Sequence, residues 1–374
     1  MLAVVAALSL GAVACGGGSN SASATATSTG ATAVPGRIPA DIGKNDSADV
    51  LGAGATFPAP VYQAWFDDYT KVAKNVRINY QALGSGAGIQ QLIARTVDFG
   101  ASDAAMSDKE LSKEPDAQHI PTVIGAITVA YNLSGLSHPL KLDGPTIGGI
   151  FLGKIKKWND SAITALNPGV SLPDNGIQVV YRSDSSGTSF NFTDYLAKVS
   201  PDWKNGPGVN KAPNWPTGQG AKGNEGVTGI IKQTPNSIGY VELQYAVANN
   251  VSFADVENAA GKFVTPSTQS ASAAAAGATI PEDYRASITN AGGDASYPIT
   301  AMTYLLLYRS TGKCSVQRPL VDMLWWAFHD PSAQKEITNL FYAPLPANLL
   351  PRIDATLQSL TCDNGTPSLR RTPG

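Results

Sequence analysis

Short apolar segments that end in small residues and lead into helical patterns recur in the first part of this sequence. Three of them begin at Val50, Val76 and Val97, and each has the alternation or the β-branched content of a strand. A helical spacing of apolar residues follows within a few positions, as in Val61 and Trp65. This order of strand, glycine-rich turn and helix predicts an α/β fold with mostly parallel strands.

Polar residues stand directly after four of the apolar runs. They are Thr56, Ser85, Asp103 and Arg182. Open α/β sheets bind ligands outside the carboxyl ends of their strands. The sequence therefore predicts one binding site built from several loops.

The loop after the apolar run 179–182 has the composition of an anion site. Arg182 ends the strand, and the loop Ser183–Thr188 is rich in hydroxyl groups before a helical pattern begins. A helix N-terminus offers unpaired N–H groups, and an arginine fork grips two oxygens of an oxyanion. Asp184 is close enough to hold the guanidinium. The alternative is an ordinary strand-to-helix turn with Ser186 or Thr188 as N-cap; the shared position of four polar residues at strand ends favours the site.

The length of the chain favours two domains. A chain of 374 residues, 43% of them hydrophobic, can bury two cores. Segments that cross between them near Asn132 and Pro298 would form a hinge. We predict one lobe from residues 48–132 and 299–374, and a second from residues 133–298.

The N-terminus has the pattern of an exported lipoprotein. Residues 1–14 are uncharged and apolar, which predicts a signal peptide. Cys15 follows small residues as in a bacterial lipobox, so we expect it to carry the lipid (palmitate), although no Lys or Arg precedes the apolar run. The alternative is a disordered apolar N-terminus. Residues 15–47 are rich in Ser, Ala, Thr and Gly and predict a flexible tether, which would place the protein outside the cell membrane, at the cell surface or in the periplasm.

The two remaining cysteines, Cys314 and Cys362, form an even pair in a chain expected to be exported. A disulfide between them is the prediction, and two reduced buried cysteines are the alternative.

Composition and motifs argue against several functions. The net charge of −2 and the lack of a long charged run do not indicate a basic surface for binding nucleic acid. No Cys, His or Asp spacing is typical of a metal site. Ser85 lacks the G-x-S-x-G pattern, and no histidine is placed as its base. We therefore predict no catalytic residue, no metal and no cofactor.

Four longer motifs together resemble the phosphate-binding proteins of phosphate-specific ABC transporters. They lie at residues 52–60, 96–103, 151–158 and 186–190, and the resemblance runs from about residue 48 to 360. It implies a two-lobed periplasmic-binding-protein fold (type II) with a hinge between the lobes.

The same resemblance implies a set of phosphate ligands, with Asp184 pairing with the arginine. The set is Thr56, Phe57, Ser85, Asp103, Arg182, Ser186, Gly187 and Thr188. Two positions depart from the family pattern: Gly86 stands where a serine is frequent, and Ser185 where a glycine is frequent.

The resemblance implies a protein that binds inorganic phosphate and is not an enzyme. Such a protein delivers phosphate to the permease subunits of an ABC transporter, which work with an ATPase. It would be a monomer anchored to the membrane through lipid. Asp103 would accept a hydrogen bond from a protonated oxygen of phosphate, and sulfate carries no such proton at neutral pH. The alternatives are a phosphate sensor, a receptor for another tetrahedral oxyanion, or a phosphatase using Ser85 or Ser186.

Overall fold

The computed structural model describes residues 37–39, 41–136, 138–363 and 365–369. The predicted signal peptide, Cys15 and most of the predicted tether lie outside these residues. Within the last part of that predicted tether, Ile42 is buried and the first strand, β1, begins at Ser47. Packing of the chain therefore begins before residue 48.

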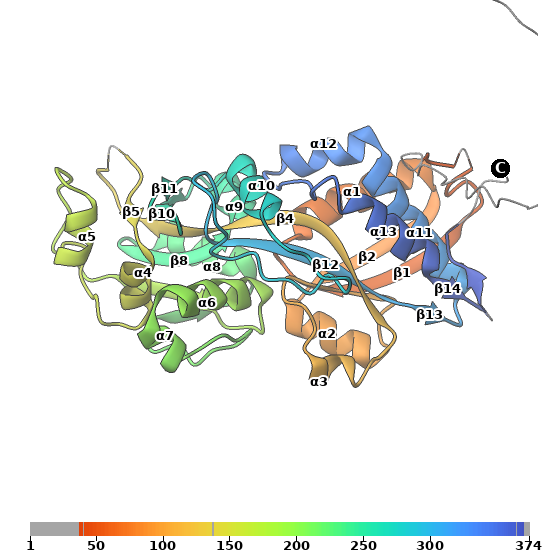
Figure 1. Cartoon of the computed structure of the whole chain (residues 1–374), viewed down its shortest axis with the longest axis horizontal. Coiled ribbons are helices and arrows are strands. Elements are labelled where there is room, and N and C mark those ends of the chain that lie inside the picture. The colour runs from red at the N-terminus through yellow and green to blue at the C-terminus, as the bar shows by residue number, and fades with distance from the viewer. Residues whose placement is uncertain (1–36, 40, 137, 364, 370–374) are drawn as a thin grey trace, which may run out of the picture. The chain divides into compact units, whose positions relative to one another are not determined.

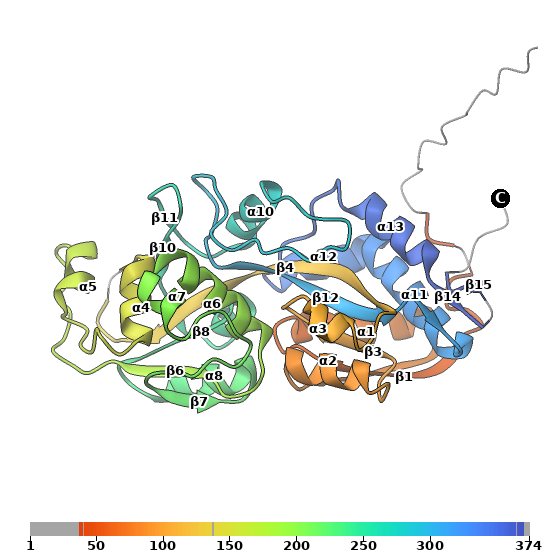
Figure 2. The ribbon, with the colours of Figure 1, turned by 60° about the horizontal axis from the view of Figure 1, so that its bottom comes forward.

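One nine-stranded sheet organises the described chain (Figures 1 and 2). Its strands in spatial order are β2 (Asn75–Ala82), β1 (Ser47–Gly54), β3 (Phe99–Ser102), β12 (Thr300–Tyr308), β4 (Ala117–Asn132), β8 (Ser237–Glu242), β6 (Gln178–Arg182) and β7 (Gln219–Ala221), with β9 (Ser252–Phe253) paired to β4.

Parallel pairing occurs at both ends of this sheet, and antiparallel pairing in its middle. β2, β1 and β3 are parallel, as are β8, β6 and β7, whereas β12 and β4 run antiparallel to their neighbours. The α/β fold is confirmed. The prediction of mostly parallel strands holds only for the strands that a helix connects, because a parallel neighbour requires a crossover connection.

The long strand β4 belongs to both ends of the sheet. It pairs with β12 through Ala126 and with β8 from Ile127 onward. β12 begins at Thr300, and Figure 1 shows the two strands running together through the middle of the sheet. The chain thus passes between the two ends a few residues before Asn132 and again beside Pro298, close to the predicted crossings. The lobe boundaries remain a prediction.

The helices follow the apolar periodicity of the sequence. They are α1 (Ala59–Val72), α2 (Ser85–Ile93), α3 (Asp108–Leu111), α4 (Gly144–Phe151), α5 (Ser161–Leu166), α6 (Gly187–Val199), α7 (Pro201–Asn205), α8 (Gly223–Gln233), α9 (Leu243–Ala248), α10 (Thr268–Ala276), α11 (Cys314–His329), α12 (Pro331–Asn339) and α13 (Leu350–Ser359). The shorter strands are β5 (Lys141–Leu142), β10 (Asp255–Glu257), β11 (Phe263–Val264), β13 (Ser310–Thr311), β14 (Thr361–Cys362) and β15 (Thr366–Pro367).

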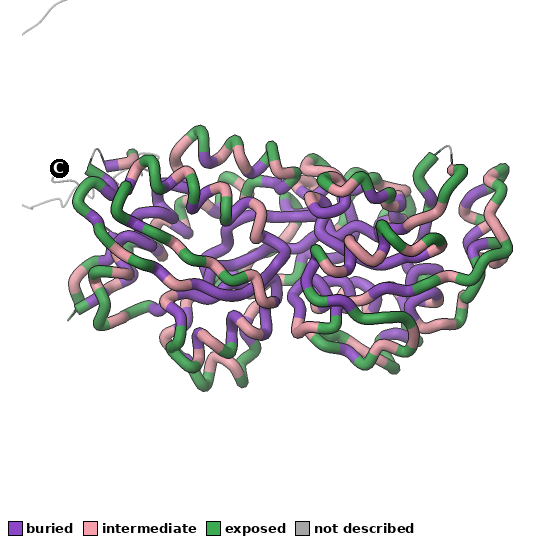
Figure 3. Tube along the Cα trace, turned by 180° about the vertical axis from the view of Figure 1, so that it is seen from behind, coloured by how far each residue is buried: buried purple, intermediate pink, exposed green. Residues whose placement is uncertain are grey.

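Helix α1 shows why these segments are helical. Pro60 stands in its first turn, where a missing N–H costs nothing. Val61, Trp65 and Tyr69 recur at a spacing of four and are all buried. Figure 3 shows buried residues gathered in the interior of the molecule, with exposed residues toward the outside. Burial of this stripe fixes α1, and with it the loop that precedes α1, against the sheet.

The disulfide between Cys314 and Cys362 is present, with 5.1 Å between the Cα atoms. It joins the start of α11 to β14, as predicted. None of the helices within the described residues has the length and hydrophobicity needed to cross a membrane.

Candidate functional site

Four loops meet where strands end. The loop after β1 contains Thr56, the turn after β2 leads into Ser85 at the start of α2, β3 is followed by Asp103, and β6 ends at Arg182. All four residues are buried. The predicted convergence of these loops is confirmed by the hydrogen bonds described below.

Ser85 joins two of the loops directly. Its Oγ accepts hydrogen bonds from the N–H groups of Asp103, at 3.2 Å, and of Gly187, at 3.0 Å. A Cβ atom at Gly187 would lie 2.4 Å from Ser85 Oγ and 2.7 Å from Asp103 Oδ2. Only glycine therefore lets the start of α6 approach the loops after β2 and β3 so closely.

Thr56 and Phe57 form the loop between β1 and α1. The Oγ1 of Thr56 accepts from Asn224, at 2.9 Å from Nδ2 and 3.2 Å from the backbone N. The N–H of Phe57 has no hydrogen-bond acceptor in the described part of the chain. This N–H is a donor available to an anion.

Arg182 is a buried cation held by a carboxylate. Its side chain is 1% exposed, and its Nε and Nη2 donate to the two carboxylate oxygens of Asp184 at 2.7 and 2.5 Å. Burial alone would raise the pKa of Asp184, but the hydrogen bonds and the charge of Arg182 outweigh it and lower that pKa. The predicted pairing is confirmed, and it fixes the guanidinium in place.

The N-terminus of α6 lies beside this guanidinium. Ser186 caps the helix by accepting from the N–H of Ser189 at 3.1 Å. The Oγ1 of Thr188 accepts from Arg182 Nη1 and from Asn224 Nδ2, each at 3.3 Å. Ser186 is thus an N-cap, as the simpler interpretation proposed, and Arg182 is buried rather than on the surface.

Asp103 carries a carboxyl group in a low-dielectric position. Burial raises its pKa to about 7, although the hydrogen bond from Thr303 and the charge of Arg182 act to lower it. The Oγ1 of Thr303 donates to Oδ1 at 2.8 Å. A pKa near neutrality lets this carboxyl group exchange a proton with a ligand.

Three polar side chains that support the site were not predicted. Asn224 contacts Thr56 and Thr188, Asn191 donates to the carbonyl of Asp103 at 2.6 Å, and Thr303 donates to the Asp103 carboxylate. Asn224 follows the short strand β7, and this strand has no apolar run in the sequence that would mark it. Asn191 and Thr303 lie inside regular elements, where a polar residue gives no signal of its own.

The two departures from the family pattern lie against each other. A Cβ atom at Gly86 would be 2.1 Å from Ser185 Oγ, and the N–H of Gly86 donates to the carbonyl of Ser185 at 2.9 Å. The larger residue at 185 therefore occupies the space that the smaller residue at 86 leaves.

His119 and His329 form hydrogen bonds with residues outside this site. His119 accepts from Met106 at 3.0 Å, and burial lowers its pKa to about 4. His329 contacts Trp325 and Asp354. No group of three or more His, Cys, Asp or Glu within the described ranges could hold a metal ion. The chemistry available in the site is that of hydrogen-bond donors, one paired cation and one carboxyl group.

Comparisons with known proteins agree with this chemistry. Residues 20–322 match the family model described as the PBP superfamily domain. The chain is 43% identical over 320 residues to the phosphate-binding protein PstS of Xylella fastidiosa (strain 9a5c), covering 85% of this chain and 87% of that protein. It is 45% identical over 309 residues to the phosphate-binding protein PstS of Pasteurella multocida (strain Pm70), covering 82% and 89%.

Solved structures share the fold. A high-affinity periplasmic phosphate-binding protein (PfluDING) with phosphate bound superposes with a TM-score of 0.69 at 21% identity, over 87% of this chain and all of that one. The phosphate-binding protein from Stenotrophomonas maltophilia gives a TM-score of 0.64 at 20% identity, over 87% of this chain and 100% of its own.

Proposed function

Because the chain belongs to the PBP superfamily and, within it, to the PstS phosphate-binding proteins, we propose that it binds inorganic phosphate with high affinity for import by an ABC transporter. Its partners are then the permease subunits of that transporter and their ATPase. The single observation that carries the proposal is the placement of a paired arginine and a carboxyl group of raised pKa in one buried site.

The proposed ligands offer donors from several loops to one tetrahedral anion. They are Thr56, Phe57, Ser85, Asp103, Arg182, Ser186, Gly187 and Thr188, with Asp184 behind the arginine. Hydrogen bonds to charged groups contribute about 1.5–3 kcal/mol each. Micromolar binding needs only about 8 kcal/mol, so several such bonds leave a margin for desolvation and closure.

Asp103 makes the site selective. Thr303 donates to Oδ1, and we propose that Oδ2 accepts a hydrogen bond from the protonated oxygen of a hydrogen phosphate ion. Sulfate carries no such proton at neutral pH and would meet an ionised Asp103 with an unpaired negative charge.

Binding would close two lobes, residues 48–132 with 299–374 and residues 133–298, about a hinge in β4 and β12. Support for this comes from the pairing of β4, which changes partner from β12 to β8 between Ala126 and Ile127. The contacts of Ser85 with Gly187 and of Thr56 with Asn224 join the two predicted lobes, so the described state corresponds to a closed one.

We propose an exported monomer that loses residues 1–14 as a signal peptide and is anchored through palmitate on Cys15, facing the cell surface or periplasm. We propose that it is a binding protein and not an enzyme, since its relatives are binding proteins and the Oγ atoms of Ser85 and Ser186 accept hydrogen bonds from backbone N–H groups.

Isothermal titration of the purified full-length chain, stripped of carried-over phosphate, tests the proposal. We expect one-to-one binding of phosphate with a dissociation constant at or below about a micromolar and no measurable heat with sulfate. A generic phosphomonoester incubated with the same preparation should release no phosphate. A folded chain that binds no phosphate, or one that binds sulfate equally well, would overturn the proposal.

A further inference from the structure

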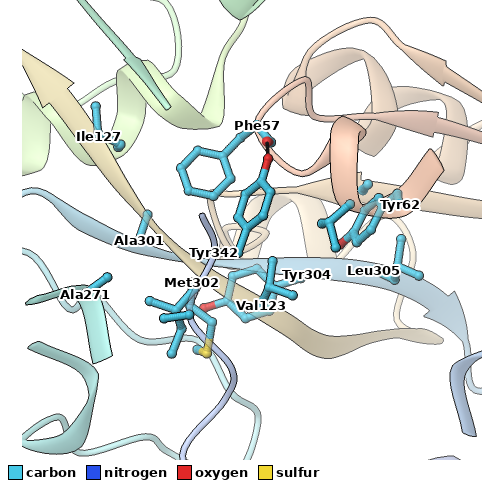
Figure 4. Close-up of a cluster of buried hydrophobic side chains, with 14 of the residues drawn as sticks. Phe57, Tyr62, Val123, Ile127, Ala271, Ala301, Met302, Tyr304, Leu305 and Tyr342 are labelled. Atoms are coloured by element: carbon cyan, nitrogen blue, oxygen red, sulfur yellow. Dashed lines mark hydrogen bonds between the residues drawn. The ribbon is translucent and has the colours of Figure 1, made fainter. Parts of the chain in front are cut away.

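Three consecutive carbonyl groups of the loop between β1 and α1 accept hydrogen bonds from three tyrosines. Tyr80 donates to Ala55 at 2.6 Å, Tyr245 to Thr56 at 2.5 Å and Tyr342 to Phe57 at 2.7 Å. Figure 4 shows the last of these. The tyrosines come from β2, from α9 and from the segment after α12. Parts of the chain that are distant in sequence thus form hydrogen bonds with one short loop.

The orientation of the Thr56 carbonyl determines the orientation of a proposed ligand. A planar trans peptide points its C=O and its N–H in opposite directions, and the described chain has no cis peptide. The carbonyl of Thr56 and the N–H of Phe57 belong to the same peptide. When Tyr245 holds this carbonyl on one side, the N–H of Phe57 points to the other side, where it has no acceptor within the described residues.

The tyrosines differ in the part of the chain from which they reach the loop. Tyr80 lies on β2, which pairs with β1, so its bond to Ala55 stays within one predicted lobe. Tyr245 lies on α9, directly after β8, at the other end of the sheet. Its bond to Thr56 joins the two predicted lobes, as do the two bonds from Asn224 to the Thr56 hydroxyl.

We propose that Tyr245 is a positioning residue that couples closure of the lobes to the aim of the Phe57 N–H at phosphate. The bond to Thr56 forms only when the lobes are closed, so it stabilises the closed, phosphate-bound state and not the open one. This inference rests on the proposed function, since it requires phosphate as the ligand and a hinge between the lobes.

The matched control is Tyr80→Phe, which removes the same hydroxyl group from the neighbouring carbonyl within one lobe. Tyr342→Phe is a poorer control, because its hydroxyl also lies 3.2 Å from Oε2 of Glu242, on the far side of the hinge. Both chosen variants keep the aromatic ring, and the rings of Tyr80 and Tyr245 are packed in the protein. The two variants therefore differ mainly in whether the lost bond joins the lobes.

The experiment measures association and dissociation of radiolabelled phosphate with the full-length chain, together with thermal unfolding with and without phosphate. For Tyr245→Phe we expect dissociation to become about 2- to 10-fold faster with the association rate unchanged. The effect is moderate because the N–H of Ala59 still donates to the Thr56 carbonyl at 3.3 Å. For Tyr80→Phe we expect an equal loss of melting temperature with and without phosphate, and an unchanged dissociation rate.

Two results would overturn the role of Tyr245 while leaving the proposed function intact. One is an unchanged dissociation rate in Tyr245→Phe, and the other is an equal acceleration in both variants. A wild-type chain that retains no phosphate would instead overturn the proposed function itself, before the variants are compared.

Discussion

Asp103 and Asp184 lie on opposite sides of one site, and their environments shift their pKa values in opposite directions. Both are removed from water, and burial is the largest influence on each. For Asp184 the two hydrogen bonds from Arg182 outweigh burial and the pKa falls. For Asp103 the partner is the neutral hydroxyl of Thr303, burial prevails, and the pKa rises to about 7.

This difference assigns different tasks to the two carboxyl groups. Asp184 stays ionised and neutralises Arg182, so the guanidinium is fixed before a ligand arrives. Asp103 is poised to give or accept a proton, so it responds to the protonation state of the ligand. In the proposed function, the β6 side of the site supplies charge and orientation, and the β3 side supplies selectivity.

Removing the positive charge of Arg182 should have the largest effect on phosphate affinity. In Arg182→Gln, phosphate loses its charged donor and Asp184 is left buried without a cation. Truncating one partner of a buried charge pair costs about 2–5 kcal/mol, so we expect phosphate affinity to fall at least about 30-fold, measured by calorimetric titration. Arg95→Gln is the control, because Arg95 pairs with Glu114 within one predicted lobe and outside the site and should leave affinity unchanged. Equal affinities in the two variants would contradict the role of Arg182.

The pH dependence of sulfate affinity should report the protonation state of Asp103. Below about pH 7 Asp103 is protonated in the unliganded site and has a proton to donate, whereas above it the ionised carboxylate repels sulfate. Sulfate affinity should therefore be level below about pH 7 and fall by up to about tenfold per pH unit above it. Phosphate brings a proton of its own and should show a shallower dependence in the same titrations. Sulfate affinity that rises with pH would contradict the assignment.

Much of the fold was predictable from the sequence, because its determinants are local. The spacing of Val61 and Trp65 predicted a helix, which is present as α1. The antiparallel middle of the sheet was not predicted. It arises from the pairing of β12 with β3 and β4, and strand pairing between segments so distant along the chain leaves no local pattern.

The polar residues that the structure brings together at the strand ends were predictable because they follow strands and match family motifs, but the residues that hold them were not. Asn224 reaches Thr56 from 168 positions away, and Tyr245 reaches it from 189. Neither stands in a motif, and a buried Asn or Tyr is more often an ordinary core residue. Likewise, the raised pKa of Asp103 depends on its burial by both sides of the site, which no local pattern encodes.

The central claim is that Asp103 makes the site selective, and the ratio of phosphate to sulfate affinity in Asp103→Asn tests it most directly. Because Thr303 donates to Oδ1, the new amide N–H₂ should take the place of Oδ2 and donate to sulfate. We expect calorimetric titration at about pH 8.5, where Asp103 is ionised, to show the ratio falling by at least about 10-fold. The matched variant Asp184→Asn should weaken both anions alike and preserve the ratio. A ratio unchanged in Asp103→Asn, or reduced equally in both variants, would contradict the account.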